Sequence, residues 1–75
     1  MTKAITIGAQ RNNAELQLFS ARRALAHLVE LYDNGRWRNH YKREESFAEA
    51  VREARRAVDH WTTVFKRFED ALADH

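Results

Sequence analysis

The sequence predicts an all-α protein, an antiparallel helical hairpin that dimerises into a four-helix bundle. Three observations lead to this prediction. Apolar residues recur with heptad spacing along two long stretches of the chain. Proline and cysteine are absent, and glycine occurs only twice, at positions 8 and 35. With 32% charged and 44% hydrophobic residues, the composition is typical of a folded helical protein rather than a disordered one.

The stronger repeat predicts a second helix over residues 46–73. It begins at Ser46, which forms a capping-box pattern with Glu49. A parallel row repeats every seven residues, so the apolar stripe is three positions wide and needs more than one facing helix. The main repeat consists of Phe47, Val51, Ala54, Val58, Trp61, Phe65, Phe68 and Leu72, and the parallel row of Ala50, Ala57, Val64 and Ala71.

The weaker repeat predicts a first helix over residues 12–34. This helix is expected to begin at Asn12 or Asn13, since Asn12 and Glu15 resemble a capping box, and Gly35 can take the left-handed conformation that closes a helix. Residues 1–11 are expected to form a flexible arm, because their short apolar run is interrupted by Gly8, and an arm packed on a partner is the alternative. Ala14, Leu18, Ala21, Leu25, Leu28 and Tyr32 carry the repeat.

The chain is one domain, residues 1–75, and it is small. A core of this size rarely supplies more than about 3–5 kcal/mol, so a small domain usually needs a disulfide, a metal or self-association. Disulfides are impossible, and the four histidines lack the spacing of metal ligands. We therefore expect no cofactor and no metal, and we expect a homodimer. The predicted dimer and core residues are Leu18, Leu25, Leu28, Tyr32, Phe47, Val51, Val58, Trp61, Phe65, Phe68 and Leu72.

The connection over residues 35–45 is the most informative polar segment. Four of its basic residues lie within eight positions, although the whole chain carries a formal charge of only +2. Aromatic and arginine side chains dominate protein-binding hot spots, so the connection is the predicted partner-binding site. Two alternatives stay open: the same residues could bind nucleic acid, or the rings could cap the end of the bundle. The predicted site consists of Arg36, Trp37, Arg38, His40, Tyr41, Lys42 and Arg43.

Catalysis is not expected. The runs beginning at Ala21 and Ala54 share the pattern Ala-Arg-Arg-Ala-aliphatic-x-His, which superficially resembles the Arg-x4–6-His signature of HEPN ribonucleases. Residues five apart on a helix point roughly 140° away from each other, so neither Arg–His pair can converge within its helix. HEPN domains are also longer. No nucleophile–base arrangement or glycine-rich phosphate loop is present.

The hairpin plan, and the run Ser46-Phe47-Ala48-Glu49-Ala50-Val51, resemble small helical-hairpin proteins that bacteriophages encode to bind and disable host proteins, such as the antiactivator of quorum sensing in Pseudomonas. The resemblance implies a dimeric adaptor or inhibitor in the bacterial cytoplasm, and it assigns no binding residue. A cytoplasmic location also suits a chain without cysteine. Membrane binding is not expected, because acidic residues are scattered among the basic ones.

Overall fold

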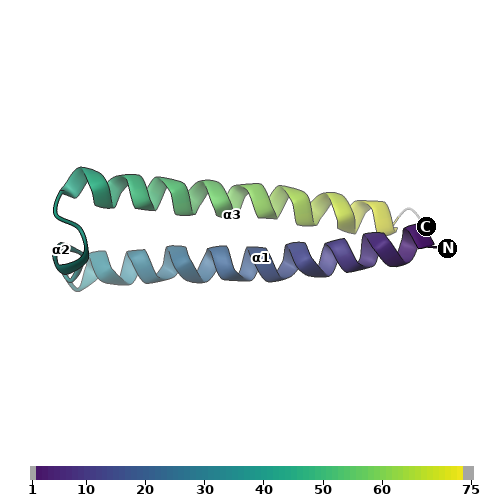
Figure 1. Cartoon of the computed structure of the whole chain (residues 1–75), viewed down its shortest axis with the longest axis horizontal. Coiled ribbons are helices and arrows are strands. Elements are labelled where there is room, and N and C mark those ends of the chain that lie inside the picture. Colours follow the sequence, from purple (N-terminus) through teal and green to yellow (C-terminus); the bar gives the residue numbers. More distant parts are fainter. Residues whose placement is uncertain (1, 74–75) are drawn as a thin grey trace.

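Two long helices lie side by side in opposite directions in the computed structural model, which describes residues 2–73 and the side chains from Thr6 onward (Figure 1). Helix α1 spans Thr2–Asp33, the short helix α2 spans Trp37–His40, and α3 spans Glu44–Ala73. The predicted all-α hairpin is confirmed. The start of α1 and the end of α3 lie together at one end, and α2 lies at the other (Figure 1). The molecule is a rod of 52 × 16 × 15 Å.

A single seam between α1 and α3 holds the core. Five hydrophobic side chains are buried among the described residues: Ala14, Leu18, Leu28, Leu31 and Phe47. Four of them come from α1. They are separated by steps of four, ten and three residues, each close to a whole number of helical turns, so they share the face that meets α3. The remaining predicted core residues of the repeats are only half-buried: Leu25, Val51, Val58, Trp61, Phe65, Phe68 and Leu72.

The core prediction was wrong for Tyr32, which is 64% exposed. Leu31, one position earlier, is buried in its place. A heptad repeat alternates steps of three and four residues, and at the end of α1 the buried row takes a step of three, from Leu28 to Leu31. The ring of Tyr32 still stacks on that of Phe47, with centroids 6.1 Å apart, so Tyr32 covers the core from outside.

The predicted flexible arm over residues 1–11 was also wrong, apart from Met1, which lies outside the described residues. Residues 2–11 continue α1, so no helix begins at Asn12 or Asn13. Ile7 lies one heptad before Ala14 and Arg11 lies three residues before it, so both continue the core row of α1, and both are half-buried. The interruption at Gly8 costs about 0.5–1 kcal/mol relative to alanine, which tertiary contacts of this kind outweigh.

Arg11 joins the first third of α1 to the last turns of α3. Its Nε donates a hydrogen bond to Oε1 of Glu69 over 2.6 Å, and its guanidinium carbon lies 5.3 Å from the ring centroid of Phe65. The same side chain lies 3.8 Å from Oε2 of Glu15. Arg11 occupies a core position of the heptad, where a polar residue fixes the register of two helices because only one alignment satisfies it.

The connection between the long helices spans residues 34–43 and contains α2, close to the connection predicted over residues 35–45. Gly35 adopts a φ of 74°, the left-handed conformation expected after α1. Its neighbour Asn34 accepts a hydrogen bond from the Arg36 amide over 2.9 Å. α3 begins at Glu44 rather than Ser46, and the Phe47 amide already bonds the Arg43 carbonyl. Glu44 in the first turn suits the positive end of the helix dipole, which explains the earlier start.

Replacing Arg11 by alanine should lower the melting temperature. The partly exposed ion pair and the cation–π contact together contribute about 1 kcal/mol, which corresponds to about 4–8 °C for a domain of this size. Thermal unfolding followed by circular dichroism measures the change. The matched control is Arg67→Ala, which removes an exposed arginine of α3 that forms no ion pair with the described residues. Equal losses in both variants would contradict the register role of Arg11.

Candidate protein-binding surfaces

The aromatic residues of the connection form a cap over one end of the seam. The ring of Phe47 lies at the centre, 5.3 Å from the ring of Trp37 and 5.4 Å from that of Tyr41. Phe47 is 5% exposed, and Leu28 and Leu31 complete the cluster. Helix α2 places Trp37 and Tyr41 four residues apart, and the Tyr41 amide bonds the Trp37 carbonyl over 2.9 Å. The two rings of the predicted partner site are therefore engaged within the chain.

The charged residues of the connection point outward. Arg36, Arg38, His40, Lys42 and Arg43 are all exposed. None of them forms an ion pair with another described residue, although the Arg38 guanidinium lies 5.5 Å from the centroid of the Trp37 ring. The structure thus separates the predicted site into two parts, a basic surface and an aromatic cap. The packing of Trp37 and Tyr41 on Phe47 agrees with the alternative in which these rings cap the end of the bundle, and both rings remain only half-buried.

One row of positions along the hairpin carries no charged residue. It consists of the seventh heptad positions of both helices, which we name the small-residue flank: Gln10, Gln17, Ala24, Leu31, Ala50, Ala57, Val64 and Ala71. Its four α3 residues are half-buried by α1 and half-exposed to solvent. Small side chains allow the backbone of another helix to approach closely. An additional helix can therefore approach this row closely without covering a charged member of it.

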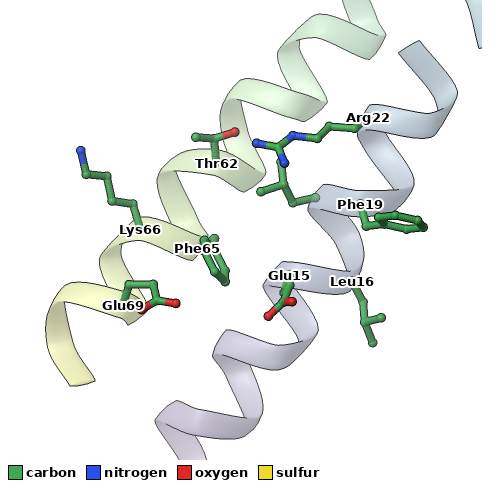
Figure 2. Close-up of a pocket in the computed structure, with 9 residues that line it drawn as sticks. Glu15, Leu16, Phe19, Arg22, Thr62, Phe65, Lys66 and Glu69 are labelled. Atoms are coloured by element: carbon green, nitrogen blue, oxygen red, sulfur yellow. The ribbon is translucent and has the colours of Figure 1, made fainter. Parts of the chain in front are cut away.

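The opposite side carries two apolar hollows, and we name it the groove flank. The first hollow is lined by Leu16, Leu18 and Phe19 of α1 and by Phe65 of α3. Figure 2 shows Phe65 pointing from α3 toward α1, whereas Leu16 and Phe19 extend from α1 on the side away from α3. In the same view Arg22 reaches across from α1 toward Thr62, and Glu15 and Glu69 stand at the other end.

The second hollow lies closer to the turn, on the same flank. Val29 and Tyr32 of α1 face Phe47, Ala48 and Val51 of α3 there, and Arg55 lines the hollow on the side nearer the first one. Both hollows lie on the same flank, because residues that line them occupy the same heptad position. Val29 of the second hollow lies seven residues after Arg22 of the first, and Arg55 of the second lies seven residues before Thr62 of the first.

Ion pairs neutralise some of the charges on the outside of α3. Arg52 bonds Glu49 with an N–O distance of 2.8 Å, and Arg56 bonds Glu53 over 2.6 Å. The hydrogen bond and the positive charge of Arg52 lower the pKa of the Glu49 carboxyl below its ordinary value. Arg22, Arg55 and Lys66, in contrast, form no ion pair with the described part of the chain. The unneutralised charge of the groove flank is therefore positive near its middle.

Sequence reasoning missed the groove flank. Leu16, Phe19 and Val29 lie outside the main heptad row, and their exposed fractions are 69%, 60% and 49%. The detectable signal was the presence of large apolar residues at positions where the repeat predicts polar ones.

Over residues 2–73, no group of three or more His, Cys, Asp or Glu side chains lies close enough together to hold a metal ion. Across the same residues, neither long helix is long and apolar enough to span a membrane. His60 packs edge-on against the neighbouring Trp61 ring, with centroids 4.9 Å apart.

Comparison with known proteins places residues 15–74 in one family, described as "Conserved hypothetical protein CHP03809". The chain belongs to this family. The match covers both hollows, the aromatic cap and all of α3, and it begins after Arg11. The family description states no activity and no partner. No curated protein and no solved structure matches the chain.

Replacing Phe47 by alanine should remove the centre of the aromatic cap. A buried phenylalanine truncated to alanine costs about 3–5 kcal/mol, which is close to the whole stability of a domain of this size. Urea unfolding followed by tryptophan fluorescence measures the loss. The control is Phe19→Ala, at a ring that is 60% exposed, where we expect a change of less than about 0.5 kcal/mol. Similar midpoints for both variants would show that the cap does not hold the turn.

Proposed function

We propose that this chain is a non-enzymatic protein-binding module that acts as a cytoplasmic homodimer, an adaptor or inhibitor of another cellular protein. The surface area of the hairpin is the observation that supports it. A compact monomer of 8.9 kDa exposes about 4,800 Å². The hairpin exposes 6146 Å², and its radius of gyration is 16.3 Å. A compact chain of this length has a radius of gyration of about 11 Å.

The excess area matches what protein interfaces use. A standard interface buries about 800 Å² on each partner, which is less than the excess that the hairpin carries. Much of this area is apolar, because most of the heptad row on α3 is half-exposed, from Val51 to Leu72. Covering these side chains with another protein removes apolar surface from water, which contributes about 25 cal/mol for each Å².

The small-residue flank is the proposed dimer contact. Two copies that pack their α3 helices along Ala50, Ala57, Val64 and Ala71 would form a four-helix bundle, as the three-position stripe predicts. An isologous contact brings each residue near its own copy, and like charges would then repel. None of the members of this flank is charged, so self-association through it would not meet this repulsion.

The resemblance to phage-encoded hairpins also implies that the chain is an adaptor or an inhibitor of another protein. The family description neither names an activity nor identifies a partner. The support for protein binding is therefore the exposed apolar surface, and the partner's chemistry has to be sought on the surface that a dimer leaves free.

A second candidate function is nucleic-acid binding by the basic part of the connection. The observation that favours it is the exposure of Arg36, Arg38, Lys42 and Arg43, which have no acidic partner among the described residues. Trp37 and Tyr41 pack on Phe47, so this binding would rely on phosphate contacts rather than on stacking of bases.

Light scattering should give a constant dimer mass over about a hundredfold range of concentration. Val64→Glu should convert the dimer to a monomer that keeps its helical circular dichroism, because a symmetric contact buries the new charge twice. The matched control is Thr63→Glu, which adds the same charge at the adjacent, exposed position and should leave the mass unchanged. A monomeric wild-type protein at all concentrations would refute the homodimer.

The second candidate is tested by replacing Arg36, Arg38, Lys42 and Arg43 together with alanine. If they bind phosphates, wild-type affinity for a duplex oligonucleotide should fall steeply with salt, with a slope of about −0.9 per phosphate contact on a log–log plot. The variant should lose this binding. Fluorescence anisotropy measures both. Absence of wild-type binding at low salt, or unchanged binding by the variant, would exclude this function for the connection.

A further inference from the structure

We infer that the groove flank binds an acidic amphipathic helix of another protein, one that carries two apolar anchors three to four helical turns apart. The inference rests on the proposed protein-binding function and identifies its partner by chemistry. The large hydrophobic side chains that are exposed among the described residues number four, and all of them line this flank. They are Leu16, Phe19, Val29 and Tyr32.

The four exposed side chains form two pairs, one at each hollow. Leu16 and Phe19 line the first hollow with Phe65, and Val29 and Tyr32 line the second with Phe47. Along α1 the positions of the two pairs are thirteen residues apart, which corresponds to about 20 Å. A partner helix that runs along the flank would therefore place its anchors eleven or fourteen residues apart, about 17–21 Å, because residues at these spacings share one face of a helix. Helix-in-groove recognition uses apolar anchors of this kind.

The segment between the hollows is basic. Arg22 lines the inner end of the first hollow and Arg55 that of the second, and both side chains are exposed. Neither forms an ion pair with any described residue, including Asp59, four residues after Arg55. Glu15 and Glu69, at the far end, are both paired with Arg11. A bound helix with carboxylates between its anchors would supply the missing counter-charges through charge-assisted hydrogen bonds.

A second copy of the chain fits this flank less well than an acidic helix. In an isologous antiparallel contact, the middle of the flank meets the middle of the same flank on the partner. Arg22 and Arg55 would then face their own copies, and like charges in contact are unfavourable. The small-residue flank has no such conflict. The two flanks lie on opposite sides of the seam, so a dimer formed through one leaves the other accessible.

The probe is a fluorescent synthetic helix with leucine anchors fourteen residues apart and four glutamates between them. Its control has lysines in place of the glutamates. We expect wild-type protein to bind the acidic peptide and not the basic one in an anisotropy titration. Arg22→Gln with Arg55→Gln should weaken binding about tenfold or more, because two charge-assisted contacts are lost. The matched control is Arg36→Gln with Arg38→Gln, which changes the net charge equally in the connection and should leave the affinity unchanged.

A second variant pair tests the apolar hollow at constant charge. Leu16→Ser with Phe19→Ser should weaken binding about tenfold or more and leave the fold intact, because both side chains are exposed. Gln10→Ser with Gln17→Ser is the control on the small-residue flank, and it should bind normally. Light scattering on the same samples should show that the serine substitutions at Leu16 and Phe19 leave the dimer mass unchanged.

Several outcomes would overturn the inference. These are equal binding of both peptides, no binding of either, or an equal loss in the Arg36 and Arg38 control, which would move the site to the connection. A monomer produced by the Leu16 and Phe19 variant would assign the flank to the second copy. Wild-type binding to phosphatidylglycerol vesicles without peptide binding would assign it to a membrane surface. A monomeric wild-type protein that still binds the acidic peptide would refute only the homodimer.

Discussion

Two helices can cover each other along one seam only, and this chain carries more apolar rows than one seam can bury. The wide stripe on α3 and the exposed residues of α1 follow from this geometry. Phe47 is the one described α3 side chain that is buried, because three aromatic rings and the end of α1 surround it. Elsewhere the seam covers each α3 residue from one side. The hairpin therefore exposes apolar surface on both flanks. The small-residue flank has no charged member, whereas Arg22 and Arg55 lie on the groove flank.

Heptad spacing predicted both long helices and the burial of Leu18, Leu28 and Phe47, and the polar connection between the helices predicted their antiparallel arrangement. It could not predict residues 2–11, where the local signals of Gly8 and of the Asn12 cap favoured a later start. The helix there is supported by the contact of Arg11 with Glu69, and a contact across 58 positions has no local signature. The start of α3 was displaced for a related reason: Ser46 is a good cap, but Glu44 suits the helix dipole two residues earlier.

The candidate site was harder to predict than the fold. The concentration of arginines and aromatic rings in the connection predicted a binding site there. In the structure those rings pack in the aromatic cap, and the basic side chains are exposed. Leu16, Phe19 and Val29 gave a weaker signal, because isolated apolar residues on a helix exterior are common. Only their placement beside Phe65 and Phe47 on one flank shows that they gather into two hollows. Sequence spacing specifies a helix face, whereas a groove also depends on the neighbouring helix.

The order in which the contacts can form also follows from the hairpin. The cap around Phe47 joins residues close in sequence, with Trp37 only ten positions away, whereas the Arg11–Glu69 bond closes a loop of 58. Short loops close at a smaller entropic cost. Folding should therefore begin with the contacts at the turn, and the contacts between α1 and α3 should then form progressively toward the two termini. Contacts absent from the transition state govern the rate of unfolding. The cap would then set how fast the chain folds, and Arg11 would set how long the folded hairpin survives before it opens from its terminal end.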